Sequence, residues 1–139
     1  MAEVEDVLAR LSLFADLTPA QLEGIAHRFE EEVFPAGARV LRKDLHGSGL
    51  FVILDGEAVV HRGGEEISRF GPGEFFGEIS LLTGDPPVAD VEALTLLRCL
   101  VIPGPAFEPF LIEHPRVLLR MLQAEARRLR VTTEWKTSS

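Results

Sequence analysis

The residues best suited to do chemistry form the short run Phe76, Gly77, Glu78, Ile79 and Ser80. Glycine has no Cβ, so Gly77 lets the backbone come close to a bound molecule. If a short helix begins after it, the free N–H groups of its first turn point towards an anion. The Glu78 carboxylate can accept a hydrogen bond from a hydroxyl group. The run therefore suits a molecule that carries an anionic group beside a hydroxyl.

The segment around this run is acidic. From Phe70 to Leu97 there is no lysine or arginine, whereas five carboxylates occur there: Glu74, Glu78, Asp85, Asp90 and Glu92. An anion bound here would depend on helix N–H groups, whose effect is typically below about 2 kcal/mol. The segment itself therefore favours weak anion binding.

Other reactive residue types form no catalytic or metal-binding pattern. The histidines His27, His46, His61 and His114 are dispersed and include no His-x-His pair, so a metal centre is not expected. Cys99 is the only cysteine, which excludes an intramolecular disulfide, and its apolar neighbours indicate a small core residue. We expect no enzyme, no metal and no cofactor.

The composition bounds the class of protein. A chain of 139 residues is long enough for one domain, and 46% hydrophobic with 26% charged residues is typical of a globular one. A net charge of −8 argues against nucleic-acid binding by this chain alone. No apolar run approaches the roughly 18 residues of a membrane span. We expect a single cytoplasmic domain over residues 1–139.

Helices are predicted at both ends. Residues 1–30 are predicted to form the N-terminal helices. One of these helices is predicted to start near Thr18, because Thr18 is a suitable N-cap, Pro19 suits the first helical position and Gln21 completes a capping-box pattern. Residues 105–134 are predicted to form a short helix and a long one that begins at Pro115. The long helix carries one apolar stripe: Val117, Leu118, Met121, Leu122 and Leu129.

Between these helices, residues 31–102 are predicted to be strands. Asp55-Gly56 and Gly63-Gly64 predict hairpin turns, and Leu50 to Leu54 predicts a buried strand. Many short strands separated by glycines indicate an antiparallel jelly-roll β-barrel. The expected fold is mainly β with flanking helices.

Three motifs in this order of elements resemble the cyclic-nucleotide-binding domain family. They are Phe34-Pro35-Ala36-Gly37, Leu50-Phe51-Val52-Ile53-Leu54-Asp55-Gly56 and Phe76-Gly77-Glu78-Ile79-Ser80-Leu81-Leu82. The resemblance covers about Leu11 to Arg130. It implies that residues 71–92 are a phosphate-binding cassette for cyclic AMP or cyclic GMP, in which Glu78 binds the ribose 2′-hydroxyl. It also implies that Arg127 or Arg128 on the long helix covers the purine or reaches the phosphate.

The second half of the cassette departs from the family pattern. The family continues Pro-Arg-Ala-Ala-Thr or close variants, where this chain has Pro86-Pro87-Val88-Ala89-Asp90. Pro87 cannot replace the bidentate, charge-assisted contact of an arginine with phosphate. An ionised Asp90 would repel the phosphate. Together the two changes predict a loss of roughly two to four decades in affinity.

The expected function is a regulatory domain that senses a small molecule of the cyclic-nucleotide type through hinge movement of the C-terminal helix. Two alternatives stay open. The domain is a ligand-independent scaffold or protein-interaction module, or it is the N-terminal sensor of a longer transcription regulator. Because the predicted long helix reaches nearly to Ser139, we expect no helix-turn-helix within this chain itself. The apolar stripe of that helix predicts a weak, salt-sensitive homodimer.

Overall fold

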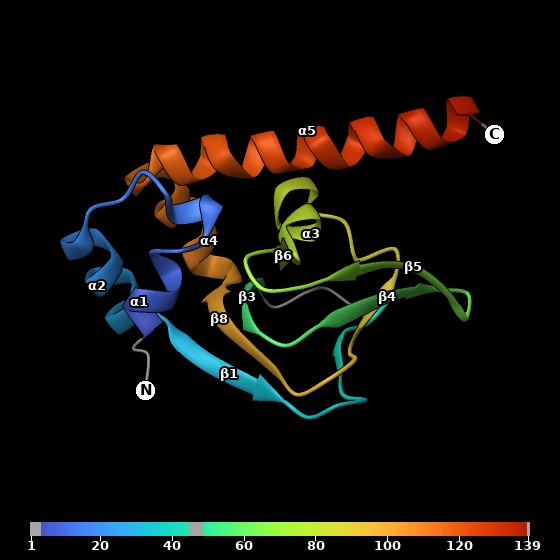
Figure 1. The fold of residues 1–139 in the computed structure, drawn as a ribbon, viewed down its shortest axis with the longest axis horizontal. Coiled ribbons are helices and arrows are strands. Elements are labelled where there is room, and N and C mark those ends of the chain that lie inside the picture. Colours follow the sequence, from blue (N-terminus) through green and yellow to red (C-terminus); the bar gives the residue numbers. More distant parts are fainter. Residues whose placement is uncertain (1–3, 45–48, 139) are drawn as a thin grey trace.

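Two four-stranded antiparallel sheets form the centre of the fold, seen in a computed structural model that describes residues 4–44 and 49–138 (Figure 1). One sheet has the order β1-β8-β3-β6, made of β1 (Glu30–Phe34), β8 (Leu97–Pro103), β3 (Gly49–Asp55) and β6 (Phe75–Phe76). The other has the order β2-β7-β4-β5, made of β2 (Arg39–Leu41), β7 (Asp90–Ala93), β4 (Ala58–Arg62) and β5 (Glu65–Phe70). The predicted mainly β fold with flanking helices is confirmed. Within the described residues, however, no strand pairing closes the two sheets into a barrel.

One of the two predicted hairpins is present and the other is wrong. Gly63-Gly64 joins β4 to its antiparallel neighbour β5. Asp55-Gly56 joins β3 to β4, but these strands lie in different sheets. Gly56 has φ +89°, and a Cβ there would lie 2.2 Å from the carbonyl oxygen of Leu96. Because both edges of β3 are already paired with β6 and β8, the chain turns at Gly56 into the other sheet.

The helices flank the sheets as predicted. The N-terminal part contains α1 (Val4–Leu8), η1 (Ser12–Phe14) and α2 (Pro19–Arg28), so the first helix ends at Leu8. The capping box of α2 is confirmed: the N–H of Gln21 donates to Thr18 Oγ1 at 3.2 Å, and the N–H of Thr18 donates to Gln21 Oε1 at 2.9 Å. After α3 (Glu78–Thr83), the chain ends in α4 (Gly104–Glu113) and α5 (Pro115–Ser138).

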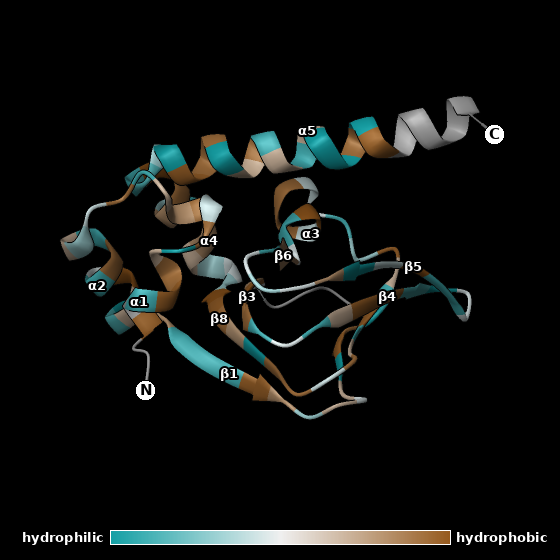
Figure 2. Cartoon of the chain, in the orientation of Figure 1, coloured by the Kyte–Doolittle hydropathy of each residue, from teal (hydrophilic) through white to brown (hydrophobic). Residues whose placement is uncertain are grey.

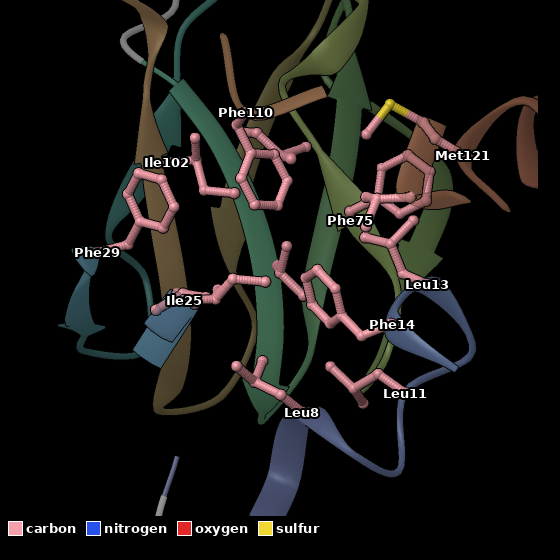
Figure 3. Packing of buried hydrophobic residues seen from close by; sticks show 14 of the residues in the cluster. Leu8, Leu11, Leu13, Phe14, Ile25, Phe29, Phe75, Ile102, Phe110 and Met121 are labelled. Carbon is pink, nitrogen blue, oxygen red and sulfur yellow. The ribbon is translucent and has the colours of Figure 1, made fainter. Parts of the chain in front are cut away.

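The core consists of two clusters on opposite faces of the β1-β8-β3-β6 sheet. One packs this sheet against the helices, with Phe14, Phe75, Phe110 and Met121 among its side chains (Figure 3). The other fills the space between the two sheets and includes the buried Cys99. Burying each large apolar side chain contributes about 1.5–3 kcal/mol.

Only part of the predicted stripe on α5 joins the core. Val117 and Met121 are buried, whereas Leu118, Leu122 and Leu129 are 43%, 62% and 68% exposed. Apolar and polar residues alternate along α5 in Figure 2, and Leu118, Leu122 and Leu129 form an exposed apolar strip on this helix. None of the helices in the part of the chain that the structure describes combines the length and apolar character of a membrane span.

Ion pairs hold the start of α5 against the N-terminal helices. Arg120 donates to both carboxylate oxygens of Asp16, at 2.8 and 3.0 Å, and Arg116 Nε lies 3.4 Å from Asp16 Oδ2. The hydrogen bond from Arg120 and the nearby Arg116 lower the pKa of Asp16 to about 2. These contacts fix the direction in which α5 runs across α3 (Figure 1).

Candidate functional site

Gly77 makes the sharp bend between β6 and α3. It has φ +93°, and a Cβ there would lie 2.3 Å from the carbonyl oxygen of Gly49 on β3. Only glycine fits this combination of conformation and close approach. The predicted short helix begins directly after it, at Glu78, and ends at Thr83, where the N–H of the C-cap Gly84 donates to the Ser80 carbonyl. The sequence therefore located this bend correctly.

A cavity of about 380 Å³ lies beside α3 and contains most of the predicted site residues. Those that line it are Phe76, Gly77, Glu78, Ile79, Ser80, Pro87, Val88, Ala89 and Arg128. Leu41, Val60 and Phe70 add apolar side chains from the second sheet. The volume lies within the range of small-molecule sites. The fold thus brings both halves of the predicted cassette around one hollow.

Asp90 and Arg127, also predicted for the site, do not line this cavity. Asp90 Oδ1 accepts a hydrogen bond from the N–H of Lys43 at 2.7 Å, which ties β7 to the loop after β2. Arg127 is exposed and lines a different groove, on the other side of Arg128. The geometry gives no support to direct repulsion of a phosphate by Asp90. A contact of either residue with a ligand stays a prediction.

Arg128 connects α5 to the cassette. Its Nη1 donates to Glu78 Oε2 at 3.2 Å and to Glu125 Oε1 at 3.0 Å, and its Nη2 donates to the Phe75 carbonyl at 2.9 Å. The guanidinium carbon also lies 4.8 and 4.5 Å from the ring centroids of Phe70 and Phe75, within cation–π range. Sequence reasoning placed Arg128 near the ligand but missed its bonds to Glu78 and Glu125.

Glu78 is 2% exposed, an unusual environment for a carboxylate. Burial, followed by the hydrogen bond and charge of Glu125, raises the pKa of Glu78 to about 8, and Arg128 opposes this rise. Glu78 and Glu125 both bind the Arg128 guanidinium, and Glu78 has little access to water. This arrangement favours one proton held by the two carboxyl groups. The i, i+3 spacing of Glu125 and Arg128 was the sequence signal for this cluster.

The cavity is poor in positive charge. Among the described residues that line it, Arg128 is the only lysine or arginine, whereas Glu78, Asp85 and Glu125 are acidic. Pro87 is half-buried, and its carbonyl accepts a hydrogen bond from the N–H of Asp44 at 2.9 Å. The arrangement can accept hydroxyl hydrogen bonds at Glu78 but offers little charge for an anion.

Other reactive groups lie away from the cavity. Cys99 is fully buried between the sheets, and burial raises the pKa of its thiol to about 12, so it is not a nucleophile there. His61 Nε2 lies 3.4 Å from Glu92 Oε2 on the second sheet. Residues 4–44 and 49–138 contain no group of three or more His, Cys, Asp or Glu side chains that could hold a metal ion.

Comparison with known proteins identifies the family and the fold. The sequence profile of the cyclic nucleotide-binding domain matches residues 31–114. The chain is 25% identical over 134 residues to a CRP-like cAMP-activated global transcriptional regulator of Mycobacterium tuberculosis, which covers 93% of this chain and 60% of that protein. It therefore spans about 60% of the length of this relative.

Solved structures agree. The catabolite activator protein of Thermus thermophilus matches with a TM-score of 0.80 and 26% identity over 91% of this chain and 62% of that chain. The regulatory subunit of a cAMP-independent protein kinase A from Trypanosoma brucei matches with a TM-score of 0.72 and 27% identity, over 84% and 45% of the two chains. The profile match covers the cassette and both sheets, and the chain therefore belongs to the cyclic nucleotide-binding domain family as a sensor domain of this type.

Proposed function

We propose that this chain is a non-enzymatic regulatory domain of a cytoplasmic protein, whose cassette cavity binds cyclic AMP or cyclic GMP weakly. One observation carries the proposal. Arg128 is the only cation among the described residues that line the cavity, and it is already bound to Glu78, Glu125 and the Phe75 carbonyl. A cyclic phosphate therefore meets helix N–H groups and no unengaged guanidinium.

The Arg128 cluster also suggests how binding is transmitted. The ribose hydroxyl of a cyclic nucleotide and the Arg128 guanidinium would compete for the Glu78 carboxylate. A ligand that takes Glu78 weakens one of the contacts that fix α5 to the cassette. The position of α5 is then the output of the sensor, through a shift between two populated arrangements.

The comparisons support a sensor role with variable dependence on cyclic AMP. The Mycobacterium relative is named as cAMP-activated, whereas the Trypanosoma regulatory subunit belongs to a kinase named as cAMP-independent. A ligand-independent scaffold is thus the second candidate function, favoured by the buried Glu78–Arg128 pair. The match covers 60% of the bacterial relative, which supports the alternative that this domain is the sensor part of a longer regulator.

Calorimetric titration with cyclic AMP and cyclic GMP tests the proposal. We expect a dissociation constant of about a millimolar or weaker. The reason is that losing the bidentate contact between an arginine and the phosphate raises a micromolar dissociation constant by about three decades. Micromolar binding of either nucleotide would overturn the weak-affinity proposal. The complete absence of binding at several millimolar would favour the scaffold.

Restoring the arginine should restore affinity. Pro87→Arg, alone or with Asp90→Thr, is expected to tighten cyclic nucleotide binding at least about tenfold, since a charge-assisted hydrogen bond contributes about 1.5–3 kcal/mol. Pro72→Arg adds the same charge at an exposed position outside the cavity and should leave affinity unchanged. Equal gains in both variants would show a non-specific charge effect. No gain from Pro87→Arg would show that the cavity is shaped for another ligand.

We also propose a weak homodimer through α5. Leu118, Leu122 and Leu129 form the exposed apolar strip of this helix. Arg127 and Arg128 line the groove and the cavity on the inner faces, which reduces the like-charge repulsion expected across a helix pair. Sedimentation should show a concentration-dependent dimer that Leu122→Glu abolishes. A strict monomer at high concentration, at both low and high salt, would contradict the dimer.

A further inference from the structure

A second and larger hollow lies between α5, η1 and β5. This groove has a volume of about 820 Å³ and is separate from the cassette cavity. Its walls are η1 with Ser12 and Leu13, the strand segment 67–70, the segment 73–75 that leads into β6, and one face of α5. Phe70 and Arg128 line both hollows and form the partition between them.

The charge of the groove is opposite to that of the chain. The chain carries a net charge of −8, yet the described residues that line the groove include four arginines and one carboxylate. The arginines are Arg69, Arg120, Arg127 and Arg128. The carboxylate is Glu74, whose Oε2 accepts a hydrogen bond from the N–H of Gly71 at 2.6 Å.

Two of these arginines are available to a ligand. Arg120 is held by Asp16, and Arg128 by the cassette cluster. Arg69 bonds to Glu66 on its own strand in an ion pair whose side chains are about half exposed, and such surface pairs contribute little and exchange easily. Arg127 is exposed, and the structure shows no ion pair for it among the described residues.

The floor of the groove is apolar. Leu13 and Phe75 are both 3% exposed and present the edge of the core, and the small side chain of Ala124 leaves room on the α5 side. A volume of this size accommodates a drug-sized molecule. Cations at the rim and aromatic or aliphatic groups on the floor match a molecule with an anionic head and an apolar body.

We propose that this groove is a second binding site, distinct from the cassette cavity, for an organic anion with an aromatic or aliphatic body. Arg127 and Arg69 bind the anionic head, and Leu13, Phe75 and Ala124 contact the body. The site needs no cyclic nucleotide, so its occupation is independent of the function proposed for the cassette.

Titration with 8-anilinonaphthalene-1-sulfonate, an anionic aromatic fluorophore, tests this site. We expect one high-affinity site per chain and a blue-shifted emission. Arg127→Gln with Arg69→Gln should weaken binding at least tenfold. The control Arg39→Gln with Arg62→Gln removes the same two charges at exposed positions outside the groove and should leave binding unchanged. Ala124→Phe fills the floor and should abolish binding.

A matched control separates the groove from the exposed strip of α5. Ala126→Phe makes the same change two residues away, at an exposed position that does not line the groove, and should keep full binding. Loss of binding in Ala126→Phe but not in Ala124→Phe would place the fluorophore on the outer face and overturn the proposal. Equal binding by the wild type and the double arginine variant would do the same. Thermal unfolding of each variant confirms that it is folded before titration.

Discussion

Replacing Gly77 with alanine is expected to lower the free energy of unfolding by about 2–5 kcal/mol, a large fraction of the roughly 5–15 kcal/mol that stabilises an ordinary domain. The left-handed conformation at φ +93° costs a residue with a Cβ about 1–2 kcal/mol. The added Cβ would also lie 2.3 Å from the carbonyl oxygen of Gly49, which belongs to the backbone of β3 and cannot rotate away. Forcing the two apart adds about 1–3 kcal/mol. Urea unfolding followed by circular dichroism measures the loss.

Gly84 at the other end of α3 is the matched control. It also has a left-handed conformation, with φ +80°, but a Cβ there would have no atom within 4 Å. Gly84→Ala should therefore show the conformational cost alone, about 1–2 kcal/mol. If both variants lost the same free energy, the contact of Gly77 with β3 would have no energetic role. If Gly77→Ala were as stable as the wild type, the bend would not need glycine.

Features set by neighbouring residues could be predicted from the sequence. Thr18, Pro19 and Gln21 give the start of α2 because a capping box is closed within four residues. Pro115 gives the start of α5 because proline favours the first position of a helix. The bend at Gly77 could be predicted because the motif around it is short and contiguous.

Features set by segments distant in the chain could not be predicted from the sequence. Asp55-Gly56 signals a turn, but whether the next strand pairs with β3 depends on β6 and β8, which come later in the chain and occupy both its edges. Asp90 was placed beside the ligand by its position in the motif, yet its carboxylate binds the backbone of Lys43, 47 residues earlier. The Glu78–Arg128 contact joins residues 50 apart, and only the packing of α5 across α3 brings them together.

The contact between Glu78 and Arg128 leads to the second prediction with a large expected effect on stability. Replacing Arg128 with leucine is expected to lower the free energy of unfolding by about 2–4 kcal/mol near pH 9, because it leaves a buried carboxylate without its cation. The loss should be smaller near pH 6. There Glu78, with its pKa raised to about 8, holds a proton in the folded protein and has no charge to compensate. What remains at pH 6 is the loss of the bonds to Glu125 and the Phe75 carbonyl.

The direction of the pH dependence follows from the raised pKa of Glu78. In the unfolded chain a glutamate ionises near pH 4.3, so between about that pH and about 8 the folded protein binds one more proton than the unfolded one. The contribution of Glu78 to stability therefore falls as the pH rises through this window. Without Arg128 the pKa of Glu78 rises further, and the fall should continue above pH 8. Thermal or urea unfolding at several pH values measures both slopes.

Glu78→Gln separates electrostatics from packing. A neutral amide of the same shape removes the titrating group, so Glu78→Gln should flatten the pH dependence in this window. In the double variant Glu78→Gln with Arg128→Leu, the fully buried carboxylate is gone and only the half-buried Glu125 has lost its contact with Arg128. The part of the loss that appears between pH 6 and pH 9 should therefore be recovered. Arg127→Leu, the neighbouring arginine outside the cluster, should change stability by less than about 0.5 kcal/mol.

A loss in Arg128→Leu that is independent of pH and not rescued by Glu78→Gln would show that Arg128 acts only by packing between Phe70 and Phe75. The contact with Glu78 would then have no part in holding α5 to the cassette.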